Sequence, residues 1–177
     1  MFVFFTFYLF ILRQIVKLIG GDIKASSTSL LLLPTIFLKS NSLYDIFMLL
    51  LVFFSSLHHS KHGKYKMFGV LDSTLIVGVV SSILLNYWAS ICITLFTFLE
   101  KQILHTNIIK FMILGLCHLC LILNYQKHSM YVYFNILSFF LWKKFKPNLF
   151  FRIQWHLSCS LLLFALFPII QKDILLQ

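Results

Sequence analysis

The chain consists of long apolar runs separated by short polar or basic segments, and this alternation restricts its fold more than any other feature. A membrane-spanning helix needs about 17–25 mostly apolar residues, and the runs approach that length. They are continuous rather than alternating, which disfavours transmembrane strands. We therefore predict an all-α, polytopic transmembrane helical bundle, with about seven membrane helices that follow an N-terminal apolar segment. The runs cover residues 2–20, 26–38, 43–59, 67–85, 88–104, 107–124, 129–142 and 148–170.

The composition supports a membrane location. Only 11% of the residues are charged and 60% are hydrophobic, whereas soluble domains carry about 25% charged residues. We predict an integral, multi-pass membrane protein with an N-terminal apolar segment (1–24), a seven-helix membrane domain (25–171) and a polar tail (172–177). The first segment has no basic n-region and no obvious cleavage site, so a retained helix or a membrane-surface segment is expected.

The formal net charge of +10 suits a membrane protein better than a nucleic-acid binder. The Lys and Arg residues lie in short loops between apolar runs, where they anchor helices and set orientation. We expect membrane lipids as partners and no nucleic acid. One face holds most of these residues, and the positive-inside rule makes it cytoplasmic. That face holds Lys61, Lys64, Lys66, Lys101, Lys110, Lys143, Lys144, Lys146 and Arg152, and the opposite face holds Lys39, Lys127 and Lys172.

Four polar residues stand where a lipid-embedded chain tolerates them least. Ser55 and His59 lie near the end of one apolar run, Asp72 at the start of the next, and His156 near the start of the last. Because an even number of crossings separates these helix ends, all four residues reach the face that the lysines make cytoplasmic. The sequence therefore predicts a metal or proton site between helices near the cytoplasmic surface.

Zinc chemistry is one use of such a site. Ser55 and His59 are four residues apart and share a helical face. A neutral imidazole is a good zinc ligand, and Asp72 could accept a hydrogen bond from an imidazole or orient a metal-bound water. Bound zinc lowers the pKa of its water towards about 7 and polarises a carbonyl. This chemistry suits the hydrolysis of an ester or amide bond in a lipid.

The same residues also have structural interpretations. Histidines at a membrane interface are often only solvated, and His156 stands beside Trp155 as an ordinary interfacial pair would. Asp72 could pair with Lys64 or Lys66 of the preceding loop. The residues taken one by one leave these alternatives open.

The segment Ser55-Ser56-Leu57-His58-His59 resembles the SxxxH motif that ends the second core helix in the CREST superfamily. That superfamily comprises alkaline ceramidases, adiponectin/progestin receptors, GPI-remodelling proteins and myomaker-like proteins. Its members place an Asp early in the third helix, as Asp72 is placed here, and open the seventh helix with HxxxH. The stretches 30–38, 44–59 and 152–160 look most like the myomaker branch, and the similarity extends over about 28–170.

The resemblance implies a zinc-dependent amidase or esterase that acts on membrane lipids in an endomembrane or the plasma membrane. His59 and His156 would be its metal ligands. Ser55 and Asp72 would be its catalytic residues, supporting the metal-bound water or the oxyanion.

The sequence departs from the motif at Arg152, where members of the superfamily place the first His of HxxxH. A guanidinium has no lone pair with which to bind a metal, and its positive charge repels a metal cation. Two histidines with Asp72 could still hold zinc. Alternatively, Arg152 pairs with Asp72 in a metal-free bridge and the chain is a catalytically inactive homologue. A third interpretation, favoured by the 21 Phe residues, is a structural hydrophobic subunit of a larger membrane complex, possible in the mitochondrial inner membrane.

Overall fold

The computed structural model describes residues 2–37, 42–61, 65–124, 129–145 and 148–175, and the described ranges contain helices and turns but no strand. The predicted all-α class is therefore confirmed. The helices are α1 (Phe2–Leu18), α2 (Ile23–Ser27), the 3-10 helix η1 (Thr28–Phe37), α3 (Ser42–Ser60), α4 (Lys66–Leu84), α5 (Tyr87–Ile103), α6 (Ile108–Asn124), α7 (Ser129–Lys144) and α8 (Leu149–Leu175).

The helix boundaries follow the predicted apolar runs closely, with two differences. The run 26–38 forms two pieces, because Asp22 accepts hydrogen bonds from the backbone N–H groups of Lys24 and Ala25 and so starts α2 early. The last helix continues to Leu175, so most of the predicted polar tail (172–177) extends α8 instead of forming a separate segment.

Among the residues that the structure describes, two helices, α3 and α4, are long and apolar enough to cross a membrane. Shorter apolar stretches occur at Ile108–Leu119 of α6 and at Leu149–Ala165 of α8. These helices agree with an association of the protein with a membrane.

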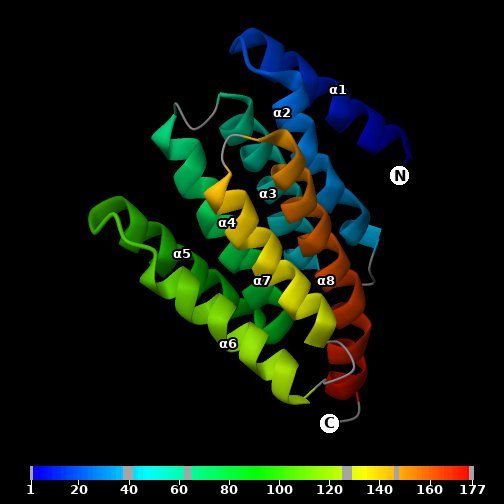
Figure 1. The fold of residues 1–177 in the computed structure, drawn as a ribbon, viewed down its shortest axis with the longest axis vertical. Helices are drawn as coiled ribbons and strands as arrows, with labels where there is room; N and C mark the ends of the chain where they lie inside the picture. Colours follow the sequence, from blue (N-terminus) through cyan, green and yellow to red (C-terminus); the bar gives the residue numbers. More distant parts are fainter. Residues whose placement is uncertain (1, 38–41, 62–64, 125–128, 146–147, 176–177) are drawn as a thin grey trace.

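The helices form a bundle in which α2 continues into η1 and, from η1 to α8, consecutive helices run in opposite directions (Figure 1). Helix α3 packs against α4 and against η1, while η1 also packs against α8, and α7 packs against α8. Helices α5 and α6 lie on the outer side of α4. The first helix lies at an angle across one end of the bundle (Figure 1). The helix ends at 60, 66, 103, 108, 144 and 149 therefore share the end of the bundle near α1.

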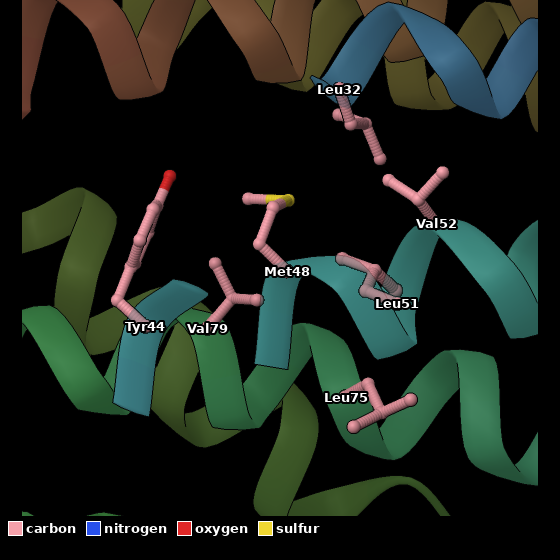
Figure 2. Packing of buried hydrophobic residues seen from close by; sticks show 7 residues of the cluster. All are labelled: Leu32, Tyr44, Met48, Leu51, Val52, Leu75 and Val79. Atoms are coloured by element: carbon pink, nitrogen blue, oxygen red, sulfur yellow. The ribbon is translucent and has the colours of Figure 1, made fainter. Parts of the chain in front are cut away.

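The largest apolar cluster joins η1, α3 and α4. Figure 2 shows Leu32 of η1 pointing towards Val52 and Leu51 of α3, with Met48 one turn away. Leu75 and Val79 contribute from α4. This cluster fixes α3 against η1 and α4, and α3 and α4 carry three of the four predicted site residues.

Many other helix contacts are made by small polar residues, while large apolar side chains point outward. Among the side chains that the structure describes, more of the buried ones are polar than apolar, and most of these are Ser or Thr. Ser90 of α5, for example, donates to the carbonyl of Ser81 of α4 at 2.9 Å. Phe96 and Phe140 are 63% exposed. Small residues at helix contacts, with hydrogen bonds across them, are typical of helix packing in lipid.

A buried polar network also connects α6, α7 and α8. Asn135 Oδ1 of α7 accepts from His118 Nε2 of α6 (3.2 Å), and the Asn135 amide nitrogen donates to Ser158 Oγ (3.1 Å) and Cys159 Sγ (3.3 Å) of α8. His118 is thus one of the groups that hold these three helices together.

Candidate functional site

The four predicted site residues lie at the end of the bundle where α3 ends and α4 and α8 begin. Ser55 and His59 occupy the last turns of α3, Asp72 lies in the second turn of α4, and His156 lies in the third turn of α8. Ser55, His59 and His156 are buried, with 2%, 7% and 4% of their surface exposed, and Asp72 is half-buried. The antiparallel course of the helices brings these positions together, because each lies within a few turns of a helix end on the same side.

The two predicted metal ligands face each other. The ring centroids of His59 and His156 are 5.2 Å apart, with 57° between the ring planes. The His156 ring donates a hydrogen bond to the backbone carbonyl of Thr28, the first residue of η1. Its buried Nδ1 atom has no hydrogen-bond partner among the described residues. η1 thus orients the His156 ring and leaves one nitrogen available beside His59.

The two predicted catalytic residues are joined in a hydrogen-bonded chain. Ser29 Oγ of η1 donates to Ser55 Oγ at 3.0 Å, and the Ser55 side chain hydrogen bonds the Asp72 carboxylate. Three segments that are distant in sequence therefore fix this carboxylate. A serine within the apolar segment 28–37 gave no signal of its own, so Ser29 was missed by the sequence analysis.

The cations that act on Asp72 come from other segments than expected. They are Lys110 of α6, the His58 ring and Lys101 of α5. Of the two lysines that the sequence suggested, Lys66 is not among them and Lys64 lies outside the described residues. Lys110 is half-buried, and its Nζ donates to Ser73 Oγ at 3.0 Å. The sequence analysis placed Lys110 among the loop lysines. A charge three residues inside an apolar run was the signal that would have identified it.

Arg152 belongs to the same site but pairs differently from the predicted bridge. Its side chain is 6% exposed, and the carboxylate that acts on it is that of Asp22, the residue that caps α2. Arg152 is not among the charged groups that act on Asp72, so the structure gives no support to the suggested Arg152–Asp72 bridge. The guanidinium charge also acts on His156, which lies four residues further along α8.

The residues present fit part of a zinc site. Two imidazoles on one tetrahedral zinc, with bonds of about 2.0–2.1 Å, place their ring centroids roughly 5 Å apart, as His59 and His156 are. The unpartnered Nδ1 of His156 supplies a free donor atom. Within the described ranges, however, no group of three or more His, Cys, Asp or Glu side chains has the arrangement of a metal site. The site therefore offers two protein ligands for zinc, whereas catalytic zinc usually has three.

Comparison with known proteins adds no assignment to this geometry. No protein-family model matches the chain, and no match was found among curated proteins or solved structures.

Proposed function

We propose that the chain is a multi-pass membrane protein whose buried site hydrolyses an ester or amide bond of a membrane lipid, with a metal ion held by His59 and His156. The observation that carries this proposal is the facing pair of buried imidazoles with an unpartnered Nδ1. A buried polar atom without a partner costs about 1–3 kcal/mol, and a metal ligand bond offsets that cost. Ionisable groups inside a membrane bundle are expensive and mark functional sites.

The membrane location is supported by the distribution of side chains, which is the reverse of that in a soluble protein. Large apolar residues are exposed on the outer helices, where soluble proteins rarely present contiguous apolar patches, and Ser and Thr are buried between helices. Trp142 and Trp155 stack at the end of the bundle that carries the site, whereas Trp88, 74% exposed, begins α5 at the opposite end. Aromatic residues at both ends are typical of the two membrane interfaces. In this proposal, each helix from α3 to α8 crosses the bilayer, and the α2–η1 segment crosses it as well.

In the proposed mechanism, His59 and His156 would hold zinc, which when bound would supply a water of pKa about 7 and polarise the carbonyl of the substrate. Asp72 is the carboxylate of this site that would accept a proton. Ser55 positions Asp72 by the hydrogen bond between them. The positive charges of Lys110 and Lys101 oppose the effect of burial on this carboxylate, which favours its protonated form.

The test measures zinc content and fatty-acid release by the purified full-length protein in lipid nanodiscs. We expect His59→Ala and His156→Ala each to lose both zinc and release, because each removes half of the protein ligands. His105→Ala is the matched control, since His105 is exposed in the turn after α5; it should retain both. Equal zinc in the wild type and the His59→Ala/His156→Ala double variant would contradict the proposal.

An inactive homologue is the second candidate, and Arg152 is the observation that favours it. A buried guanidinium one helical turn from His156 opposes a bound cation. Arg152→His separates the two candidates, because it replaces that charge by a third imidazole. If the wild-type site is an active zinc site, the substitution should raise zinc retention and leave release measurable in both forms. If the wild type is inactive, zinc binding and release should appear only in the variant.

A further inference from the structure

Three lysine side chains from three helices converge at the end of the bundle that carries the site. They are Lys101 at the end of α5, Lys110 at the start of α6 and Lys143 at the end of α7, and we call them the lysine cluster. The charges of Lys101 and Lys143 both act on Lys110, and that of Lys143 acts on Lys101. Like charges repel at this range. Such an arrangement is stabilised by a bound anion.

The hydrogen bonds of the lysine cluster leave donors for such an anion. Lys101 Nζ donates to Asn107 Oδ1 at 2.8 Å, and Lys110 Nζ donates to Ser73 Oγ at 3.0 Å. Both acceptors are neutral, and an ammonium group has three donors. Each of these lysines is therefore held in place while it keeps capacity for a charged acceptor.

Two carboxylates face the lysine cluster, and one of them is committed elsewhere. Glu100 acts on Lys101, but its oxygens accept from the backbone N–H groups of Ile108 (2.6 Å) and Ile109 (3.1 Å) and from the Thr106 hydroxyl. This carboxylate caps the start of α6. Among the described residues that act on the lysine cluster, Asp72 is then the remaining carboxylate opposite three ammonium groups. The local charge is positive, as it is in basic pockets between membrane helices that bind anionic headgroups.

The surroundings of the lysine cluster place it at headgroup depth. Lys143 Nζ lies 5.5 Å from the ring centroids of both Phe139 and Trp142, and Trp142 stacks on Trp155 with 8° between the ring planes. Tryptophan and lysine together are typical of the membrane–water interface. Headgroup phosphates lie at that level, and a phosphate monoester carries about −1.5 to −2 charges near neutral pH.

We propose that Lys101, Lys110 and Lys143 bind the phosphate of an anionic membrane lipid. This proposal rests on the membrane location proposed above but does not depend on the metal site. If the hydrolase proposal also holds, the lipid bound here is its substrate, because Asp72 borders both sites. The substrate class is then a phosphate-bearing lipid with its acyl linkage towards His59 and His156.

The test measures binding of phosphatidic acid and phosphatidylcholine to the full-length protein in detergent micelles by native mass spectrometry. We expect the wild type to prefer phosphatidic acid. The variant Lys101→Gln/Lys110→Gln/Lys143→Gln should lose this affinity at least about tenfold, because each lysine near the surface attracts anionic lipid independently. The matched control is Lys17→Gln/Lys24→Gln/Lys66→Gln, which removes the same charge from three exposed lysines and should change affinity little.

Each outcome decides the proposal. Equal losses in the two triple variants, or equal binding of the two lipids, would overturn it. Competition by inorganic phosphate as strong as that by phosphatidic acid would show an ion site rather than a lipid site. If the first triple variant does not fold, Lys143→Gln alone serves, with a smaller loss expected and no loss refuting the proposal. His59→Ala/His156→Ala should keep lipid affinity and lose zinc, so that failure of one proposal is distinguishable from failure of the other.

Discussion

At the residue scale, the site depends on polar side chains that satisfy one another inside the bundle. The buried carboxylate of Asp72 is held by Ser55, which is itself held by Ser29. The ring of His156 is held by a backbone carbonyl. In a medium without water, each such bond prevents an unsatisfied group, which is costly. Small side chains with one hydrogen-bond partner each therefore contribute more to the stability of this site than their size suggests.

Ser55 and its neighbour Ser56 give a matched test of this point. Ser55→Ala removes the hydroxyl that links Ser29 to Asp72 and should lower the free energy of unfolding by about 1–3 kcal/mol. Ser56 is fully buried and its Oγ has no hydrogen-bond partner within the part of the chain that the structure describes. Ser56→Ala should therefore be neutral or stabilising. Thermal unfolding of both variants in the same detergent checks the difference, and equal effects would contradict the assigned role of Ser55.

At the element scale, η1 and α1 decide the shape of the site although neither carries a predicted site residue. η1 packs between α3 and α8 and presents Thr28 and Ser29 to the site. α1 packs against α3 through Leu12 and Val16. The turn after α1 is tied down at the end of α3: the N–H of Asp22 donates to the Ser60 carbonyl, and Lys61 Nζ donates to the Gly20 carbonyl, both at 2.8 Å.

Gly21 permits this close approach of the turn to the end of α3. A Cβ atom on Gly21 would lie 2.7 Å from Ser60 Oγ and 2.8 Å from Ser60 Cβ. Gly21→Ala should therefore separate the turn from α3 and destabilise the protein by about 1–3 kcal/mol. Limited proteolysis between α1 and α3 should accelerate as well.

Gly115 supplies the control for this substitution. A Cβ there would meet nothing within 4 Å, and alanine is the better helix former by about 1 kcal/mol. Gly115→Ala should leave proteolysis unchanged and stabilise α6 slightly. If Gly21→Ala behaves in the same way, α1 is not held in the position described.

At the scale of the whole molecule, the alternation of helix direction places the site and the lysine cluster at one end. The turns after α3, α5 and α7 share that end, and the turn between α4 and α5 lies at the other. In the proposed multi-pass arrangement, these two ends face opposite compartments. The excess of lysine at the site end predicts that this end is the cytoplasmic one.

Cysteine accessibility tests this orientation. In a variant with the native cysteines replaced by serine, His105→Cys reports on the site end and Asn86→Cys on the opposite end; both positions are exposed. A membrane-impermeant maleimide added outside intact cells that carry the protein in the plasma membrane should label only Asn86→Cys. Labelling of both, or of neither until lysis, would exclude the proposed multi-pass arrangement.

The sequence by itself determined the helices and the end of the bundle at which Ser55, His59, Asp72 and His156 lie. Continuous apolar runs encode helix positions locally, and the number of runs fixes which helix ends share a side. The tertiary structure decided the partners: Asp22 for Arg152, Lys110 for Asp72, and Ser29 and Thr28 of η1 for Ser55 and His156. Pairing between side chains depends on how helices rotate and lean against one another. That geometry arises from packing across the whole bundle, which no local pattern contains.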